Sequence, residues 1–91
     1  MDDHTYCVSP IVRASISTDG LVLLDLRGGV LLAANPVGAR IWQLLEQQHT
    51  PRTIAEQFAS DYAIEIEQAH QDVRAFIEAL LSRRLITEHA A

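Results

Sequence analysis

Two short turns limit the fold of this chain more than any other feature of its sequence. Thr18-Asp19-Gly20 and Gly28-Gly29 interrupt a strand-like pattern between residues 11 and 35, in which Val12, Ala14 and Ile16 alternate with polar residues. Asp-Gly between apolar segments is a strong hairpin signal, and paired glycines supply the backbone angles of a second tight turn. Connections this short cannot cross over to a parallel strand. The sequence therefore predicts a three-stranded antiparallel meander, with strands at residues 11–17, 21–27 and 30–34.

The chain after Asn35 changes from strand-like to helical spacing. Asn35-Pro36 is typical of a helix N-cap and first helical position, and this first helix is expected to fade by His49. Thr53 to Glu56 has the pattern of a capping box that opens a second helix. A longer third helix is predicted from about Glu67 to Arg84. The fold class is therefore α+β, with three strands followed by three helices that cover one face of the sheet.

Size and composition indicate one soluble domain over residues 1–91, with an ordered core at about residues 8–87. All seven basic residues are arginine, and the chain has twelve acidic residues, which gives a net charge of −5. This balance argues against nucleic-acid binding, which needs clustered cations. The longest apolar run, Val30 to Ala34, is too short to cross a membrane, and the acidic start of the chain is unlike a signal peptide. A cytoplasmic protein is expected.

The residues that usually carry catalysis do not form a recognisable group. The four histidines lie at separations unlike those of metal ligands, and Cys7 has no catalytic signature around it. Gly28-Gly29 precedes a strand, whereas phosphate-binding loops open a helix. We therefore expect no enzyme activity, no metal and no cofactor.

The third predicted strand, Val30 to Ala34, has no charge and no proline. In a meander the first and third strands are the edges, and proteins normally protect edges with charged residues or proline. The first strand follows this rule with Arg13, but the third does not. Either the third strand is covered and shielded by the third helix, or it is a docking edge for an extended peptide.

The third helix fits the second of these interpretations. Helical spacing places Ala69, Val73, Phe76 and Leu80 on its apolar face. The neighbouring stripe consists of small or polar residues: Gln68, Asp72, Ala75 and Ala79. Small side chains next to an apolar ridge can leave a shallow groove, although alanines also occur on solvated faces because they favour helix.

Several stretches together resemble the PqqD-like peptide chaperones, which are the recognition elements of pathways that modify ribosomally made peptides. The similarity is carried by the order and spacing of these segments: Leu23 to Arg27, Asn35 to Leu45, Thr53 to Glu56, Asp61-Tyr62, Asp72-Val73 with Phe76, and Arg84 to Ile86. It covers about residues 8–88. One departure is that Val30, Leu31 and Leu32 stand where many relatives have an aromatic residue, which affects the size of an anchoring pocket.

The resemblance implies a winged-helix-like fold that binds the leader segment of a precursor peptide. The leader would add as a strand to the third strand and lie in the groove beside the third helix. The chain looks most like the leader-binding subunit of lasso-peptide proteases, whose partner is a separate transglutaminase-like cysteine protease; another modifying enzyme is the alternative. The candidate binding residues are Val30, Leu31, Leu32, Ala33, Ala34, Ala69, Asp72, Val73, Ala75, Phe76, Ala79 and Leu80.

Two other functions remain open from the sequence. A winged-helix DNA-binding regulator would need a basic recognition helix, but Arg74, Arg83 and Arg84 of the third helix are balanced by nearby acidic residues. A dimerising scaffold could instead pair its bare edge strand with a second copy.

Overall fold

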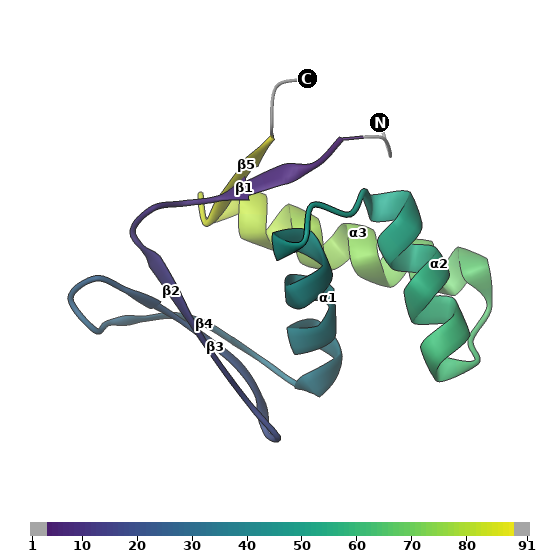
Figure 1. The fold of residues 1–91 in the computed structure, drawn as a ribbon, viewed down its shortest axis with the longest axis horizontal. Helices are drawn as coiled ribbons and strands as arrows, with labels where there is room; N and C mark the ends of the chain where they lie inside the picture. The colour runs from purple at the N-terminus through teal and green to yellow at the C-terminus, as the bar shows by residue number, and fades with distance from the viewer. Residues whose placement is uncertain (1–3, 89–91) are drawn as a thin grey trace.

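The computed structural model describes residues 4–88, and it confirms the α+β fold class (Figure 1). A three-stranded antiparallel sheet has the order β2-β3-β4 and is followed in the chain by three helices. The strands are β2 (Val12–Ser17), β3 (Gly20–Asp25) and β4 (Val30–Ala34). The helices are α1 (Pro36–Glu46), α2 (Pro51–Tyr62) and α3 (Ile66–Ser82).

A second, two-stranded sheet joins the two ends of the described chain and was not predicted from the sequence. Strand β1 (Tyr6–Val8) pairs antiparallel with β5 (Ile86–Glu88). The Tyr6 side chain is only 7% exposed, and the Nε2 of Gln48 donates a hydrogen bond of 2.9 Å to the Tyr6 carbonyl. The structured region thus begins before residue 8. Strands of three residues are too short to show an alternating pattern, which is why the sequence does not reveal them.

The turns of the main sheet form where glycine and aspartate predict them. Gly20 follows a two-residue loop with a φ of 134°, and a Cβ there would collide with the carbonyl oxygen of Ala34. In the β3–β4 turn the carboxylate of Asp25 accepts hydrogen bonds from the N–H groups of Arg27 and Gly29, at 2.8 and 2.9 Å. The Gly29 and Arg27 bonds hold the pKa of Asp25 below its ordinary value. This turn ends β3 at Asp25, two residues earlier than predicted.

The first helix begins as predicted, but the second does not. The side chain of Asn35 accepts a hydrogen bond of 2.9 Å from the Gly38 N–H, which caps α1. The cap of α2 is Thr50, whose Oγ1 accepts from the Thr53 N–H at 3.3 Å. The prediction of a capping box at Thr53 to Glu56 was therefore wrong. Thr50-Pro51 has the same arrangement of N-cap and proline as Asn35-Pro36. Because Thr50-Pro51 precedes Thr53, it determines where α2 starts.

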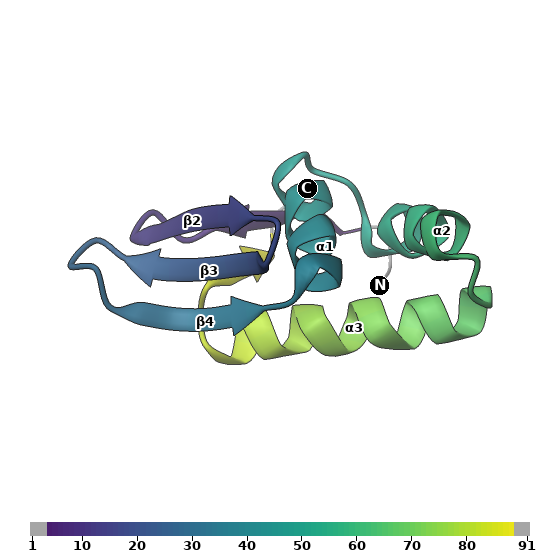
Figure 2. The same ribbon diagram turned by 90° about the horizontal axis from the view of Figure 1, so that it is seen from below.

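One hydrophobic core lies between the three helices, β3 and the small sheet. Trp42, Leu23, Ile54 and Leu80 are each 0% exposed within it. Figure 2 shows α1 standing at the end of the main sheet, while α3 runs along the side on which β4 is the nearest strand. Among residues 4–88, no helix combines the length and apolar character needed to cross a membrane.

Candidate functional site

The open edge of β4 is the most distinctive surface of the fold. β4 pairs with β3 on one side and is the last strand of the sheet on the other, as predicted. The Nη1 of Arg83 donates a hydrogen bond of 2.9 Å to the carbonyl of Leu31. This contact shows that the Leu31 carbonyl points away from β3. Leu31 is the extra residue at a register shift between the Leu24–Val30 and Leu23–Leu32 pairs, so the direction of other backbone groups cannot be counted from it. Ala33 lies in the regular part of the pairing, where its N–H and carbonyl face the same open side.

The register of the other hairpin leads to the same conclusion. Ser17 pairs with Gly20 across a two-residue loop, and the residue pair next to such a loop is hydrogen-bonded. Alternation makes Ser15 and Val22 the next hydrogen-bonded pair, so Val22 directs its backbone groups toward β2. Ala33 is the partner of Val22 on β4, and its own groups therefore remain unpaired by the sheet.

A hollow of about 560 Å³ lies beside this edge, between β4, α1, α2 and α3. Its lining is mostly apolar and includes one carboxylate, that of Asp72. The lining residues are Leu32, Ala33, Ala34, Asn35, Val37, Gly38, Ile41, Phe58, Asp72 and Phe76. We refer to this hollow together with the open edge of β4 as the β4–α3 groove. An extended segment placed there can satisfy the backbone of Ala33 and bury apolar side chains.

Gly38 forms the floor of the groove. A Cβ on Gly38 would lie 2.7 Å from the Ala34 Cβ and 3.3 Å from Cε1 of Phe76, both closer than ordinary van der Waals contact. The glycine therefore allows the end of β4 and the ring from α3 to approach the first turn of α1. Glycine lowers helix propensity at such a position, so packing accounts for its presence.

The predicted site residues separate into two groups. Leu32, Ala33, Ala34, Asp72 and Phe76 line the groove; Val30 and Leu31 continue the edge of β4, and Ala75 and Ala79 are exposed on α3. The other three predicted residues, Ala69, Val73 and Leu80, are at most 1% exposed and belong to the core. They hold α3 in place, and we leave them out of the proposed binding surface. Sequence reasoning missed the contributions of α1 and α2, namely Val37, Gly38, Ile41 and Phe58.

The polar groups of the groove can form hydrogen bonds with a ligand, but they are not arranged as a catalytic group. Asp72 accepts a hydrogen bond of 2.9 Å from Nε2 of Gln68. Cys7 is an exposed free thiol on β1, outside the groove lining. Within residues 4–88, no three His, Cys, Asp or Glu side chains gather as metal ligands.

A second hollow, of about 230 Å³, lies on the opposite flank of α3. Its lining includes Tyr6, Pro51, Ile77 and Leu81, with charged residues at the rim. Strands β1 and β5 contribute Tyr6 and Glu88 to this lining, but each has only three residues, so they offer an extended segment less backbone pairing than β4 does.

Known proteins match this fold over nearly its whole length. A solved structure described as TbiB1 in complex with the TbiA(beta) leader peptide has a TM-score of 0.79 and 30% identity, covering 92% of this chain and 98% of that one. A lasso peptide synthetase B1 complexed with the leader peptide has a TM-score of 0.80 and 28% identity, covering 90% of this chain and 96% of that one. A search of curated proteins finds no match. The family model of coenzyme PQQ synthesis protein D (PqqD) matches residues 20–86, and the chain therefore belongs to the PqqD family, as the sequence resemblance predicted.

Proposed function

We propose that this protein binds the leader segment of a ribosomally made precursor peptide and presents it to a separate processing enzyme. The leader adds as a strand to β4 and places apolar side chains in the β4–α3 groove. The observation that carries the proposal is the outward-facing backbone of Ala33 beside a mostly apolar hollow. The two similar structures support it, because both contain a leader peptide.

The processing enzyme that fits best is a lasso-peptide leader protease of the transglutaminase-like cysteine type. The support is the similarity to the lasso peptide synthetase B1. In this proposal the chain is an accessory subunit, since the groove offers recognition groups without a nucleophile and base in contact.

The expected affinity follows from two kinds of contact. Each backbone hydrogen bond contributes about 0.5 to 1.5 kcal/mol net. Each buried apolar anchor adds about 1.5 to 3 kcal/mol. After the cost of ordering the peptide, a dissociation constant between about 1 μM and tens of nanomolar is expected. Backbone pairing then supplies affinity for any extended segment, and the apolar anchors supply specificity.

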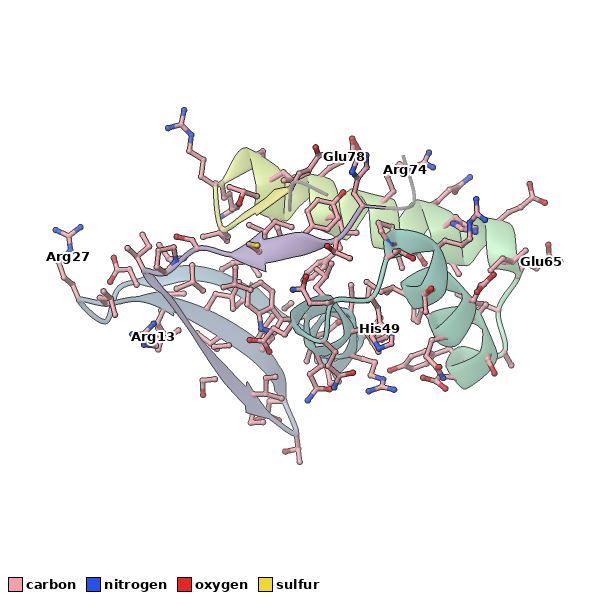
Figure 3. The ribbon with its side chains drawn as sticks, turned by 45° about the horizontal axis from the view of Figure 1, so that its top comes forward. Arg13, Arg27, His49, Glu65, Arg74 and Glu78 are labelled. Atoms are coloured by element: carbon pink, nitrogen blue, oxygen red, sulfur yellow. The ribbon has the colours of Figure 1, made fainter. Side chains whose placement is uncertain are left out.

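The distribution of charge argues against a DNA-binding regulator. The net charge is −5, and Figure 3 shows Arg13 and Arg27 at the sheet while Arg74 lies on α3. Phosphate binding requires cations gathered along one face. The arginines of this chain are instead distributed over separate elements.

The first experiment compares two ligands. We expect the labelled leader of the precursor encoded beside this gene to bind with submicromolar to micromolar affinity, and a random duplex to bind far more weakly even at low salt. Fluorescence anisotropy measures both. Submicromolar duplex binding without leader binding would overturn the proposal in favour of a DNA-binding regulator.

The isolated chain is expected to leave its precursor unchanged. Incubation of the two, followed by mass spectrometry, should show the intact precursor mass until the partner protease is added. The Cys7→Ala variant should behave identically in both steps, because this exposed thiol lies outside the groove. Cleavage by the isolated protein would contradict its accessory role.

Filling the floor of the groove should block the leader. In Gly38→Leu the new side chain would project between Ala34 and Phe76, where even a Cβ is too close. We expect leader binding to weaken at least tenfold, about 1.4 kcal/mol, in protein shown to be folded by circular dichroism. Glu46→Leu, an exposed position in the last turn of the same helix, is the control and should bind normally. If folded Gly38→Leu binds the leader normally, the leader does not bind in this hollow.

A further inference from the structure

Arg83 lies at one end of the β4–α3 groove as an exposed cation. It is the C-cap residue of α3, and its Nη1 reaches the outward carbonyl of Leu31 on β4 at 2.9 Å. A guanidinium has five N–H donors, so this bond leaves most of them available. Among the ion pairs of residues 4–88, none involves Arg83. The residue therefore touches the edge where a peptide strand would pair, and no carboxylate of residues 4–88 neutralises its charge.

Asp72 gives the other end of the groove the opposite charge. It lies on the same helix, eleven residues before Arg83, which is about 16 Å along the helix axis. Its side chain lines the hollow together with Ala34 and Asn35, and it accepts a hydrogen bond from Gln68 rather than from a cation. The groove is thus acidic where β4 ends and basic where β4 begins.

We propose that this charge difference selects the leader and sets its direction. The inference rests on the proposed function and names the chemical class of the peptide. Antiparallel strand pairs are slightly more stable than parallel ones, so the leader runs against β4, from Asp72 toward Arg83. At about 3.3 Å per residue, 16 Å corresponds to about five residues. The bound segment then carries a basic residue, an apolar stretch, and an acidic residue about five positions after the basic one.

Arg83 contributes the larger share of this selection. Arginine and carboxylate form a two-pronged hydrogen-bonded pair that is stronger and more directional than a neutral contact. A basic leader residue at the same position would meet the positive charge of the guanidinium and be repelled. The same Arg83 side chain donates a hydrogen bond to the Leu31 carbonyl. Arg83 would therefore bind the peptide carboxylate directly beside β4, the strand with which the peptide pairs.

A displayed library of random linear peptides tests this inference without knowledge of the natural leader. It is selected in parallel on the wild-type protein, on Arg83→Glu and on Gly38→Leu, in which the groove is filled. Wild type should enrich peptides with an acidic residue about five positions after a basic one, with apolar residues between them. Arg83→Glu should enrich a basic residue at the position where wild type selects the acid.

The outcomes distinguish a failure of the proposed function from a failure of the role given to Arg83. If wild type and Gly38→Leu enrich the same peptides, the groove is not the binding site and the proposed function fails. If enrichment depends on an open groove but Arg83→Glu still selects the acid, only the role of Arg83 is overturned.

A charge exchange on one selected peptide makes the test quantitative. Replacing its acidic residue with lysine should weaken binding about tenfold on wild type and strengthen it about tenfold on Arg83→Glu. Arg83→Gln retains N–H donors for the Leu31 carbonyl but has no charge. It should bind the acidic and lysine forms about equally. A wild-type preference for the acidic form in Arg83→Gln would show that Arg83 acts through the backbone contact alone, and the inference would be wrong.

Discussion

Ala33→Pro should weaken leader binding at least tenfold, about 1.4 kcal/mol, while the protein stays folded. Proline cannot donate a hydrogen bond, and the Ala33 N–H faces the open side of β4. Sheets tolerate proline on an edge strand when the missing N–H points to solvent. The substitution therefore removes a donor that only an added strand would use. Titration of the labelled leader, with circular dichroism as the check on folding, measures the effect.

Two matched variants show whether the effect belongs to this edge. Ala14→Pro makes the same change on β2, where pairing with Leu23 places the Ala14 N–H on the opposite open edge of the sheet. It should change leader binding by less than about twofold. Leu32→Pro removes an N–H that faces β3, so we expect it to lower the stability of the sheet itself. If Ala14→Pro weakens binding as strongly as Ala33→Pro, the leader pairs with β2 instead.

The sequence was sufficient to predict the main sheet and the helices because their signals are local. The Asp19-Gly20 and Gly28-Gly29 turns fix the number and direction of strands, and the apolar run from Val30 to Ala34 coincides with β4. The end of β3 and the start of α2 were predicted wrongly because they depend on side-chain hydrogen bonds. Asp25 ends β3 by bonding the turn, and Thr50 starts α2 earlier than the capping-box pattern predicts.

The binding surface was only partly predictable because it depends on how elements far apart in the sequence come together. Periodicity identified the apolar face of α3 and the family resemblance implied a groove beside that helix, but neither could separate residues facing the core from those facing the groove. Ala69 and Phe76 both fall on the apolar face, yet Ala69 is 0% exposed while Phe76 lines the groove. The contributions of Val37 and Phe58 follow from the packing of α1 and α2, which no local pattern describes.

The small sheet also depends on segments far apart in the sequence, and it lies next to the end of α3. β5 follows α3 directly, and its pairing with β1 fixes the end of the helix that carries Arg83. The Ser9 N–H also donates to the Leu85 carbonyl at 2.9 Å. A segment that begins before the predicted ordered core thus anchors the chain that directly follows α3.

Tyr6→Ala should lower the free energy of unfolding by about 3 kcal/mol, a large share of the stability of a chain this small. The ring is 7% exposed and packs in the core, so truncation would leave a cavity between β1 and the helices. Cys7→Ala is the control on the same strand: its side chain is exposed, and we expect a change within about 0.5 kcal/mol. Urea denaturation of both variants measures the difference. Equal stability of the two variants would mean that β1 does not support the core, and that α3 and its Arg83 are held in place by the remaining elements alone.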